Sequence, residues 1–167
     1  MPTRCTNCGG TEFTESEERR TRHVAGYDAA GEVPVTTCDT CGERFYALGA
    51  LASFDSAVAA GLAEAGASSG EALKFMRKTM GLTAAELGKL LNLTPESISH
   101  VETGKRDADR RTVALVSAMA LENLRGAKTT IERLRALDRK EKRRHGMRSV
   151  GGKRRLDVTS LMASSRD

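Results

Sequence analysis

The sequence predicts an α+β fold in which a small N-terminal β domain precedes an all-α domain with a C-terminal helical extension. Two observations lead to this prediction. Residues 1–50 are mostly polar and are interrupted by the turn residues Gly, Asp and Pro, a pattern typical of short strands and hairpins. From residue 51 onward, apolar residues recur every three or four positions, as they do in amphipathic helices.

All four cysteines of the chain fall in two copies of one motif, Cys-x-x-Cys-Gly. The copies pair Cys5 with Cys8 and Cys38 with Cys41. Each pair can occupy two corners of a tetrahedron, and the glycine that follows lets backbone amides turn toward the sulfurs. Four thiolates favour zinc or iron, and we expect one structural Zn2+ ion because the motif implies no open ligand position.

The alternatives to a metal site are two disulfides or a redox-active Cys-x-x-Cys pair. Both are disfavoured, because the sequence shows no secretory signal and is otherwise free of cysteine. We therefore expect a cytoplasmic protein with reduced thiols.

The segment between the cysteine pairs predicts an antiparallel hairpin. A polar stretch over 11–24 forms the first strand, and the return strand is expected at 32–37. A third strand is predicted at 44–48. The turn residues expected between the first two strands are Gly26, Asp28, Gly31 and Pro34. Zinc would tie this sheet at one end, because a segment so short and polar cannot be stabilised by core burial alone.

Helices follow the sheet, and a run of small residues divides them. Apolar positions predict a first helix over 51–64. Residues 65–70, Ala-Gly-Ala-Ser-Ser-Gly, are predicted to be a flexible linker. The predicted division is a zinc-binding domain at 1–64, this linker, a helical domain at 71–145 and a basic tail at 146–167.

Two start signals predict a pair of short helices in the second domain. Thr83 and Glu86 form a capping box, in which each side chain satisfies a free backbone amide at a helix start. Thr94 followed by Pro95 is an N-cap with proline at the first helical position, and this helix is expected to end at Gly104. Two helices joined by so short a turn form a compact, right-angled pair.

Charge is distributed unevenly along the chain. Residues 1–60 hold 5 basic and 9 acidic residues, whereas residues 61–167 hold 22 basic and 13 acidic. The positive second part favours nucleic acid as its partner, and the negative first part favours a different one. No apolar run is long enough to span a membrane, so we expect no membrane partner.

Residues 81–104 resemble the helix-turn-helix of Cro/repressor-type, XRE-family DNA-binding domains, and the resemblance extends over about 71–124. It implies that the helix over 94–103 enters the major groove of double-stranded DNA. Such domains also pair an arginine of their first helix with a glutamate near the end of the recognition helix, here Arg77 and Glu102.

The resemblance also implies which side chains meet DNA. Those able to reach base edges are Pro95, Glu96, Ser97, Ser99 and His100. Those placed for phosphates are Thr94, Lys105 and Arg106. The alternative is that these side chains are only the solvated face of a helical interaction module.

Beyond Arg111 the sequence predicts a helix over about 113–119 that packs on the helix-turn-helix core, and then a longer helix that ends near Arg144. Its apolar residues form a seam at steps of three and four: Leu124, Ala127, Ile131 and Leu134. A homodimer through this seam would match a palindromic operator, and the alternative is that the stripe packs inside its own subunit. The tail at 146–167 is expected to be disordered when free, and either to lie along phosphates as a basic arm or to remain solvated.

The order of the motifs resembles the MqsA antitoxin family, with its YgiT-type zinc finger, over roughly residues 1–124. The resemblance implies that the zinc domain neutralises a toxin, usually an mRNA-cleaving ribonuclease, and that the helical domain dimerises and represses the shared operon. An acidic N-terminal domain suits a basic ribonuclease. The alternative is a stand-alone transcription regulator without a toxin. We expect no enzyme, because the sequence shows no nucleophile, metal-activated water or phosphate loop.

Overall fold

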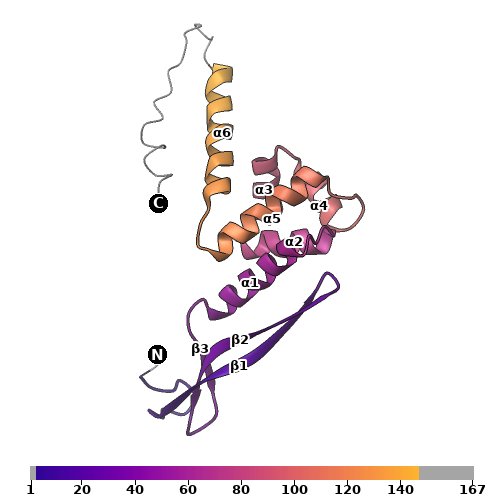
Figure 1. The fold of residues 1–167 in the computed structure, drawn as a ribbon. Helices are drawn as coiled ribbons and strands as arrows, with labels where there is room; N and C mark the ends of the chain where they lie inside the picture. Colours follow the sequence, from indigo (N-terminus) through magenta and orange to yellow (C-terminus); the bar gives the residue numbers. More distant parts are fainter. Residues whose placement is uncertain (1–2, 147–167) are drawn as a thin grey trace, which may run out of the picture.

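The computed structural model describes the backbone of residues 3–146 and the side chains of residues 3–139. A three-stranded antiparallel sheet forms its N-terminal part and a group of helices forms the rest (Figure 1). The α+β layout predicted from the sequence is therefore confirmed. Among the described residues, no helix is both long and apolar enough to cross a membrane. The predicted basic tail lies outside the described residues, apart from Gly146.

The sheet has the strand order β1-β2-β3, with β1 at Phe13–Val24, β2 at Tyr27–Cys38 and β3 at Arg44–Tyr46. The hairpin closes through the two-residue turn Ala25–Gly26, whose φ angles of 54° and 79° both lie in the left-handed region, as tight hairpin turns require. The return strand therefore begins at Tyr27, earlier than the predicted residue 32. Asp28, Gly31 and Pro34, which we predicted as turn residues, lie inside β2.

Helix α1 (Ala50–Glu64) follows the sheet and packs against both β2 and the helices. Its Phe54 ring covers Gly31, where an added Cβ would come within 3.1 Å of the ring. This contact explains why a glycine stands in the middle of the strand. It lets helix and sheet approach closely.

The other helices complete the fold. They are α2 (Gly70–Thr79), α3 (Ala84–Leu91), α4 (Pro95–Glu102), α5 (Arg110–Leu124) and α6 (Thr129–Gly146). One hydrophobic core joins α1 to this group, with Leu62 of α1, Met76 of α2 and Met119 of α5 all nearly inaccessible to solvent. Burial of such side chains is the main force that stabilises the helical part.

The segment 65–70, which we predicted to be a flexible linker, is a short turn. Ala67 is 5% exposed and belongs to the core shared by α1 and α2. The Ser69 side chain accepts a hydrogen bond from the Ala72 amide and caps α2. A run of small residues is compatible with a flexible linker or with a tight buried turn, and contacts with the rest of the fold determine which one forms. Here α1 packs with the helical part, so the helical part begins at α1, whereas we predicted that it begins after residue 70.

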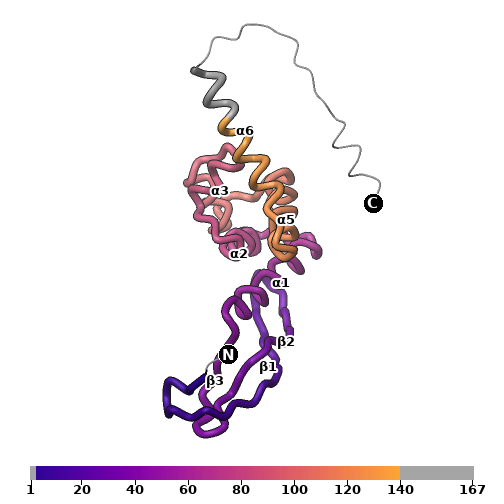
Figure 2. The backbone as a smooth tube through the Cα atoms, turned by 90° about the vertical axis from the view of Figure 1, so that its left-hand side faces the viewer, coloured from indigo at the N-terminus to yellow at the C-terminus, as the bar shows by residue number. Residues whose placement is uncertain are grey.

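The hairpin also reaches the helices, as both views of the backbone show (Figure 2). Val24, at its tip, is 5% exposed and lies in the same core. Arg22 forms an ion pair with Asp55 of α1 at 2.6 Å, and its guanidinium lies 5.9 Å from the centroid of the Phe75 ring in α2. The tip of the sheet is thus attached to the helical core.

The two helices predicted after Arg111 are present, but the boundary between them lies later in the chain than predicted. Helix α5 ends at Leu124, and Gly126, with a φ of 70°, turns the chain before α6 begins at Thr129. The four residues of the predicted seam therefore do not form one stripe. Ile131 is 3% exposed and packs in the core of its own subunit, whereas Leu124 is 47% exposed. The apolar spacing ran across a glycine that ends a helix.

Candidate metal centre and nucleic-acid interface

The structure brings the four cysteine sulfurs together. The Sγ atoms of Cys5 and Cys41 are 3.6 Å apart, those of Cys8 and Cys38 are 3.7 Å apart, and all four lie within 4.8 Å of one another. Around a zinc ion, with Zn–S bonds of about 2.3 Å, tetrahedral sulfurs stand about 3.8 Å apart. The cluster therefore has the donor type and the spacing of a four-thiolate site, and it could hold a metal ion.

The two cysteine loops are built alike. The Gly9 amide donates to the Cys5 carbonyl at 2.9 Å, and the Gly42 amide donates to the Cys38 carbonyl at 2.8 Å. In each loop the amide of the first cysteine donates to the carbonyl five residues later, at 2.8 and 2.9 Å. Both glycines have a φ of 76°, which side chains rarely tolerate. The repeated Cys-x-x-Cys-Gly motif thus encodes a repeated backbone loop.

The protonation of these thiols is uneven. Burial raises the pKa of Cys38, but the backbone amides of Cys41 and Thr40 donate to its sulfur and bring it down to about 7. The Gly10 amide lowers the pKa of Cys8, but neighbouring sulfurs and burial raise it to about 12. Sulfurs this close share protons with one another. A bound cation would displace those protons and hold all four as thiolates.

The helix-turn-helix consists of α3 and α4. The predicted capping box is present, since the Glu86 amide donates to the Thr83 hydroxyl at 3.1 Å and the Thr83 amide donates to the Glu86 carboxylate at 2.8 Å. These bonds hold the pKa of Glu86 below its ordinary value. Asn92 ends α3 in the left-handed conformation, with a φ of 55°. The Thr94 hydroxyl then caps α4 by accepting from the Ser97 amide at 3.2 Å.

Two glycines allow the helices to pack closely. A Cβ on Gly88 would lie 2.7 Å from the Leu93 carbonyl oxygen, in the turn between α3 and α4. A Cβ on Gly70 would lie only 1.9 Å from the carbonyl oxygen of Val101 in α4. Gly70 was predicted to lie in the linker, so this close contact was not expected from the sequence. The only local signal was its place directly after Ser69, a residue type that often precedes a helix.

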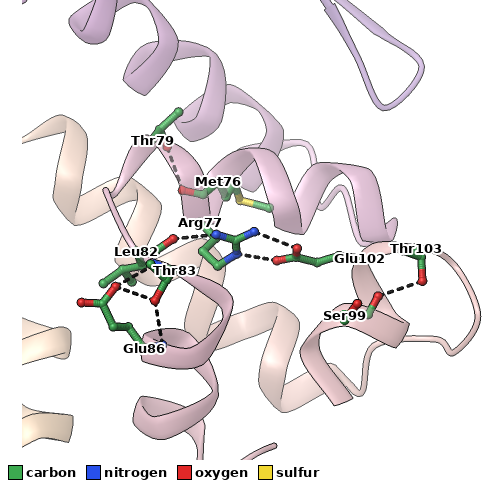
Figure 3. Close-up of polar contacts among 9 residues, drawn as sticks. All are labelled: Met76, Arg77, Thr79, Leu82, Thr83, Glu86, Ser99, Glu102 and Thr103. Atoms are coloured by element: carbon green, nitrogen blue, oxygen red, sulfur yellow. Dashed lines mark hydrogen bonds and ion pairs between the residues drawn. The ribbon is translucent and has the colours of Figure 1, made fainter. Parts of the chain in front are cut away.

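The predicted ion pair forms in the interior (Figure 3). Arg77 of α2 donates from Nε and Nη2 to the two carboxylate oxygens of Glu102, at 2.5 and 2.8 Å, and from Nη1 to the Leu82 carbonyl at 2.6 Å. Both side chains are less than 10% exposed. One guanidinium thus joins α2, the start of α3 and the last residue of α4. This fixes the orientation of α4 relative to the domain.

Opposite its buried residues Ile98 and Val101, α4 presents an exposed polar face. Five of the side chains predicted to contact DNA from this helix are exposed: Thr94, Pro95, Glu96, Ser99 and His100. Ser97 is half-buried, because its amide and hydroxyl lie against Thr94 in the cap. A backbone hydrogen bond at Glu96, followed by the Thr94 side chain, holds the pKa of the Glu96 carboxyl below its ordinary value, so this group is ionised at neutral pH.

The two predicted phosphate ligands of the loop after α4 are exposed. The backbone amides of Lys105 and Arg106 both donate to the carbonyl of His100, at 2.9 and 3.2 Å, so the loop folds back onto the end of α4. Both side chains are exposed to solvent in the loop that directly follows α4. The arrangement provides polar groups on a helix narrow enough for a DNA groove, flanked by two cations.

Comparison with known proteins agrees with this geometry for part of the chain. The helix-turn-helix family model matches residues 73–118, which cover most of α2, all of α3 and α4, and the first part of α5. No curated protein and no solved structure matches the chain significantly. The chain therefore carries an XRE-type helix-turn-helix, a domain type of DNA-binding regulators, beside a cluster of four cysteines suited to a metal ion.

Proposed function

We propose that this protein binds operator DNA in a sequence-specific way through α4 and acts as a transcriptional autorepressor and antitoxin of a toxin-antitoxin operon. One observation carries the DNA-binding part. The exposed polar face of α4 is supported from behind by the buried pair of Arg77 and Glu102, so the helix meets a groove as a rigid element. Rigid presentation lowers the entropy cost of ordering at the interface.

The cysteine cluster is proposed to bind one structural Zn2+ ion. It lies at the end of the sheet far from the hairpin tip that joins the helical core (Figure 1). Its four sulfurs leave no position for a substrate or water, which is the pattern of structural rather than catalytic zinc. The proposed role of the ion is to hold the two cysteine loops together at this end.

A groove on the sheet supports the proposal that this part of the protein binds a toxin. A groove of about 610 Å³ is lined by apolar side chains that include Phe45 and Leu48, and by the carboxylates of Glu15 and Glu17. Leu48 is fully exposed. A hydrogen bond and charge repulsion from Glu32 on the neighbouring strand raise the pKa of Glu17. An acidic rim around an apolar groove suits a basic protein partner.

A stand-alone regulator without a toxin is the second candidate, and one observation favours it. Val24 and Ala67 join the hairpin and the turn after α1 to the core of the helix-turn-helix. A metal-bound sheet attached in this way has a structural role even without a partner of its own.

A homodimer is proposed for either function, because two copies would read the two halves of a palindromic operator. The exposed Leu124 and Leu137 offer apolar surface for such pairing. Sedimentation at micromolar concentration tests this point, and a monomer would exclude the dimer.

Two measurements test the function. Fluorescence anisotropy compares binding to the protein's own promoter with binding to a scrambled duplex of equal length at moderate salt. Equal affinity for both would exclude sequence-specific regulation. Expression with the neighbouring genes and a pull-down then separates the two candidates: a stoichiometric small basic protein in the eluate supports the antitoxin, and its absence supports the stand-alone regulator.

A further inference from the structure

Helix α6 forms a groove with α3 on the side of α3 that faces away from α4. The groove has a volume of about 300 Å³, and its lining residues are Glu86, Lys89, Leu90, Arg135, Asp138 and Arg139. On α3, Gly88 faces the turn into α4, whereas Glu86 and Leu90 face α6. The three helices therefore lie in the order α6, α3, α4, with the groove next to the DNA-reading pair.

The orientation of α6 is set by its attachment to α5 and the core. The Glu122 carboxylate of α5 accepts from the amide and the hydroxyl of Thr130, at 2.8 and 2.7 Å, and so caps the start of α6. Ile131 is buried and Leu134 packs against the same core. This face of α6 is therefore fixed, and Arg135 and Arg139, one and two turns beyond Ile131, are held beside α3.

Cations outnumber carboxylates in the groove. Lys89, Arg135 and Arg139 are exposed. Of the two acidic residues, Glu86 is occupied by the capping box, where it accepts from the amide and the hydroxyl of Thr83. After these bonds from Thr83, the Arg135 guanidinium also helps to lower the pKa of Glu86, so it lies close to that carboxylate. All three cationic side chains nevertheless remain exposed, where an anion in solution can reach them. Arginine is well suited to phosphate, because its planar guanidinium donates two parallel hydrogen bonds.

The position of the groove identifies the anion. When the second helix of a helix-turn-helix lies in the major groove, the first helix crosses the sugar-phosphate backbone. Here that first helix is α3, and Lys89, Arg135 and Arg139 stand along its flank. We propose that these three residues form a second phosphate-binding surface, by which α6 extends the DNA contact of α4 onto the adjoining backbone. This inference rests on the proposed DNA-binding function.

The experiment compares two double variants with equal charge changes. R135Q/R139Q removes the two arginines of the groove, and R125Q/R133Q removes two exposed arginines outside it. Binding of each to a duplex of the protein's own promoter is measured by anisotropy over a range of salt concentrations. Circular dichroism confirms that both remain folded, as expected for substitutions of exposed side chains.

Each phosphate contact contributes about 0.9 to the slope of log K against log salt. We expect R135Q/R139Q to flatten the slope by about 1.8 and to weaken binding on the order of tenfold at physiological salt, for the promoter and for a scrambled duplex alike. R125Q/R133Q should keep the wild-type slope. Trimming the duplex to the base pairs beneath α4 should remove the difference between the wild type and R135Q/R139Q.

An unchanged slope in R135Q/R139Q, with wild-type protein that binds its promoter, would overturn this inference and leave the proposed function intact. An equal loss in both double variants would also overturn it, because it would show a general effect of charge. Absence of DNA binding by the wild-type protein would instead reject the proposed function, and this inference with it.

Discussion

Arg77 and Glu102 join the first helix of the DNA-binding region to the last residue of its recognition helix. The two nitrogens of Arg77 that face Glu102 each bond one carboxylate oxygen, and the third nitrogen bonds the Leu82 carbonyl. Each of the three guanidinium nitrogens therefore donates a hydrogen bond. The two opposite charges are paired, and both side chains are buried. Removal of one partner would leave the other charge buried and unpaired, which is costly.

The Arg77→Met substitution should therefore reduce the free energy of unfolding by about 3–5 kcal/mol. Urea unfolding followed by circular dichroism measures this loss. Lys78→Met, on the exposed neighbouring residue, is the matched control and should change little. The double variant R77M/E102L should recover much of the stability, since it leaves no unpaired charge; equal losses in the single and double variants would contradict this account.

Gly70→Ala should destabilise the protein by about 2 kcal/mol or more, because the added Cβ would meet the Val101 carbonyl at 1.9 Å and push α4 away from α2. The matched control is Gly61→Ala in the last turn of α1, where the added Cβ would meet no atom within 4 Å apart from its chain neighbours and the nearby backbone of its own helix. That change should stabilise the protein by about 0.5–1 kcal/mol, because alanine favours a helix over glycine. Thermal melts of both variants give the comparison, and equal effects would show that the close approach is unimportant.

The purified protein should hold one Zn2+ ion per chain, measured by elemental analysis. Cys38→Ser should abolish stoichiometric zinc, whereas Thr6→Ser, at an exposed position inside the first cysteine loop, should retain it. After chelation, amide hydrogen exchange should accelerate in both cysteine loops, since metal bonding no longer opposes their separation. The amides of α2 to α5 should stay protected because their core lies elsewhere. If the cysteine loops and helices α2 to α5 lost protection together after chelation, the metal would stabilise the whole fold, which would contradict this prediction.

Glu122 should make stability depend on pH. The amide and hydroxyl of Thr130 hold its pKa below the ordinary value of 4.5. A carboxylate whose pKa is lower in the folded state stabilises the fold fully above the unfolded-state value, and this contribution is lost as the pH falls through the folded-state value. Glu122→Gln should therefore destabilise the protein at neutral pH and much less in acid below 4.5. Urea midpoints across this range, with Glu64→Gln at the exposed end of α1 as control, provide the test.

Substitutions on α4 and in the loop after it should differ in kind. Glu96→Ala and His100→Ala should change which base pairs are preferred, by about tenfold at the affected positions, because they remove groups that we propose reach base edges. Lys105→Ala should weaken every duplex about equally and flatten the salt slope by about one unit. Binding to a set of single-base variants of the operator distinguishes the two patterns. If Glu96→Ala and His100→Ala weakened binding to every duplex equally, these side chains would contact the DNA backbone and not the base edges.

The sequence by itself determined the features that depend on neighbouring residues. Three such features are the repeated Cys-x-x-Cys-Gly loop, the capping box of Thr83 and Glu86, and the Thr94–Pro95 start of α4. Each satisfies backbone hydrogen-bonding groups within a few residues, so the local sequence predicts its geometry. The pair of Arg77 and Glu102 was predicted by resemblance to a known domain type, and its hydrogen bonds are present in the structure.

Only the tertiary structure decided the features that depend on distant contacts. The letters of 65–70 do not show that Ala67 would be buried, and the apolar spacing of residues 124–134 does not show that Gly126 would end one helix and start another. The close approach of Gly70 to Val101 and the groove between α3 and α6 likewise join residues far apart in the chain. The physical reason is that burial and close packing depend on both of the segments that come into contact. A local sequence pattern specifies the surface of only one of them.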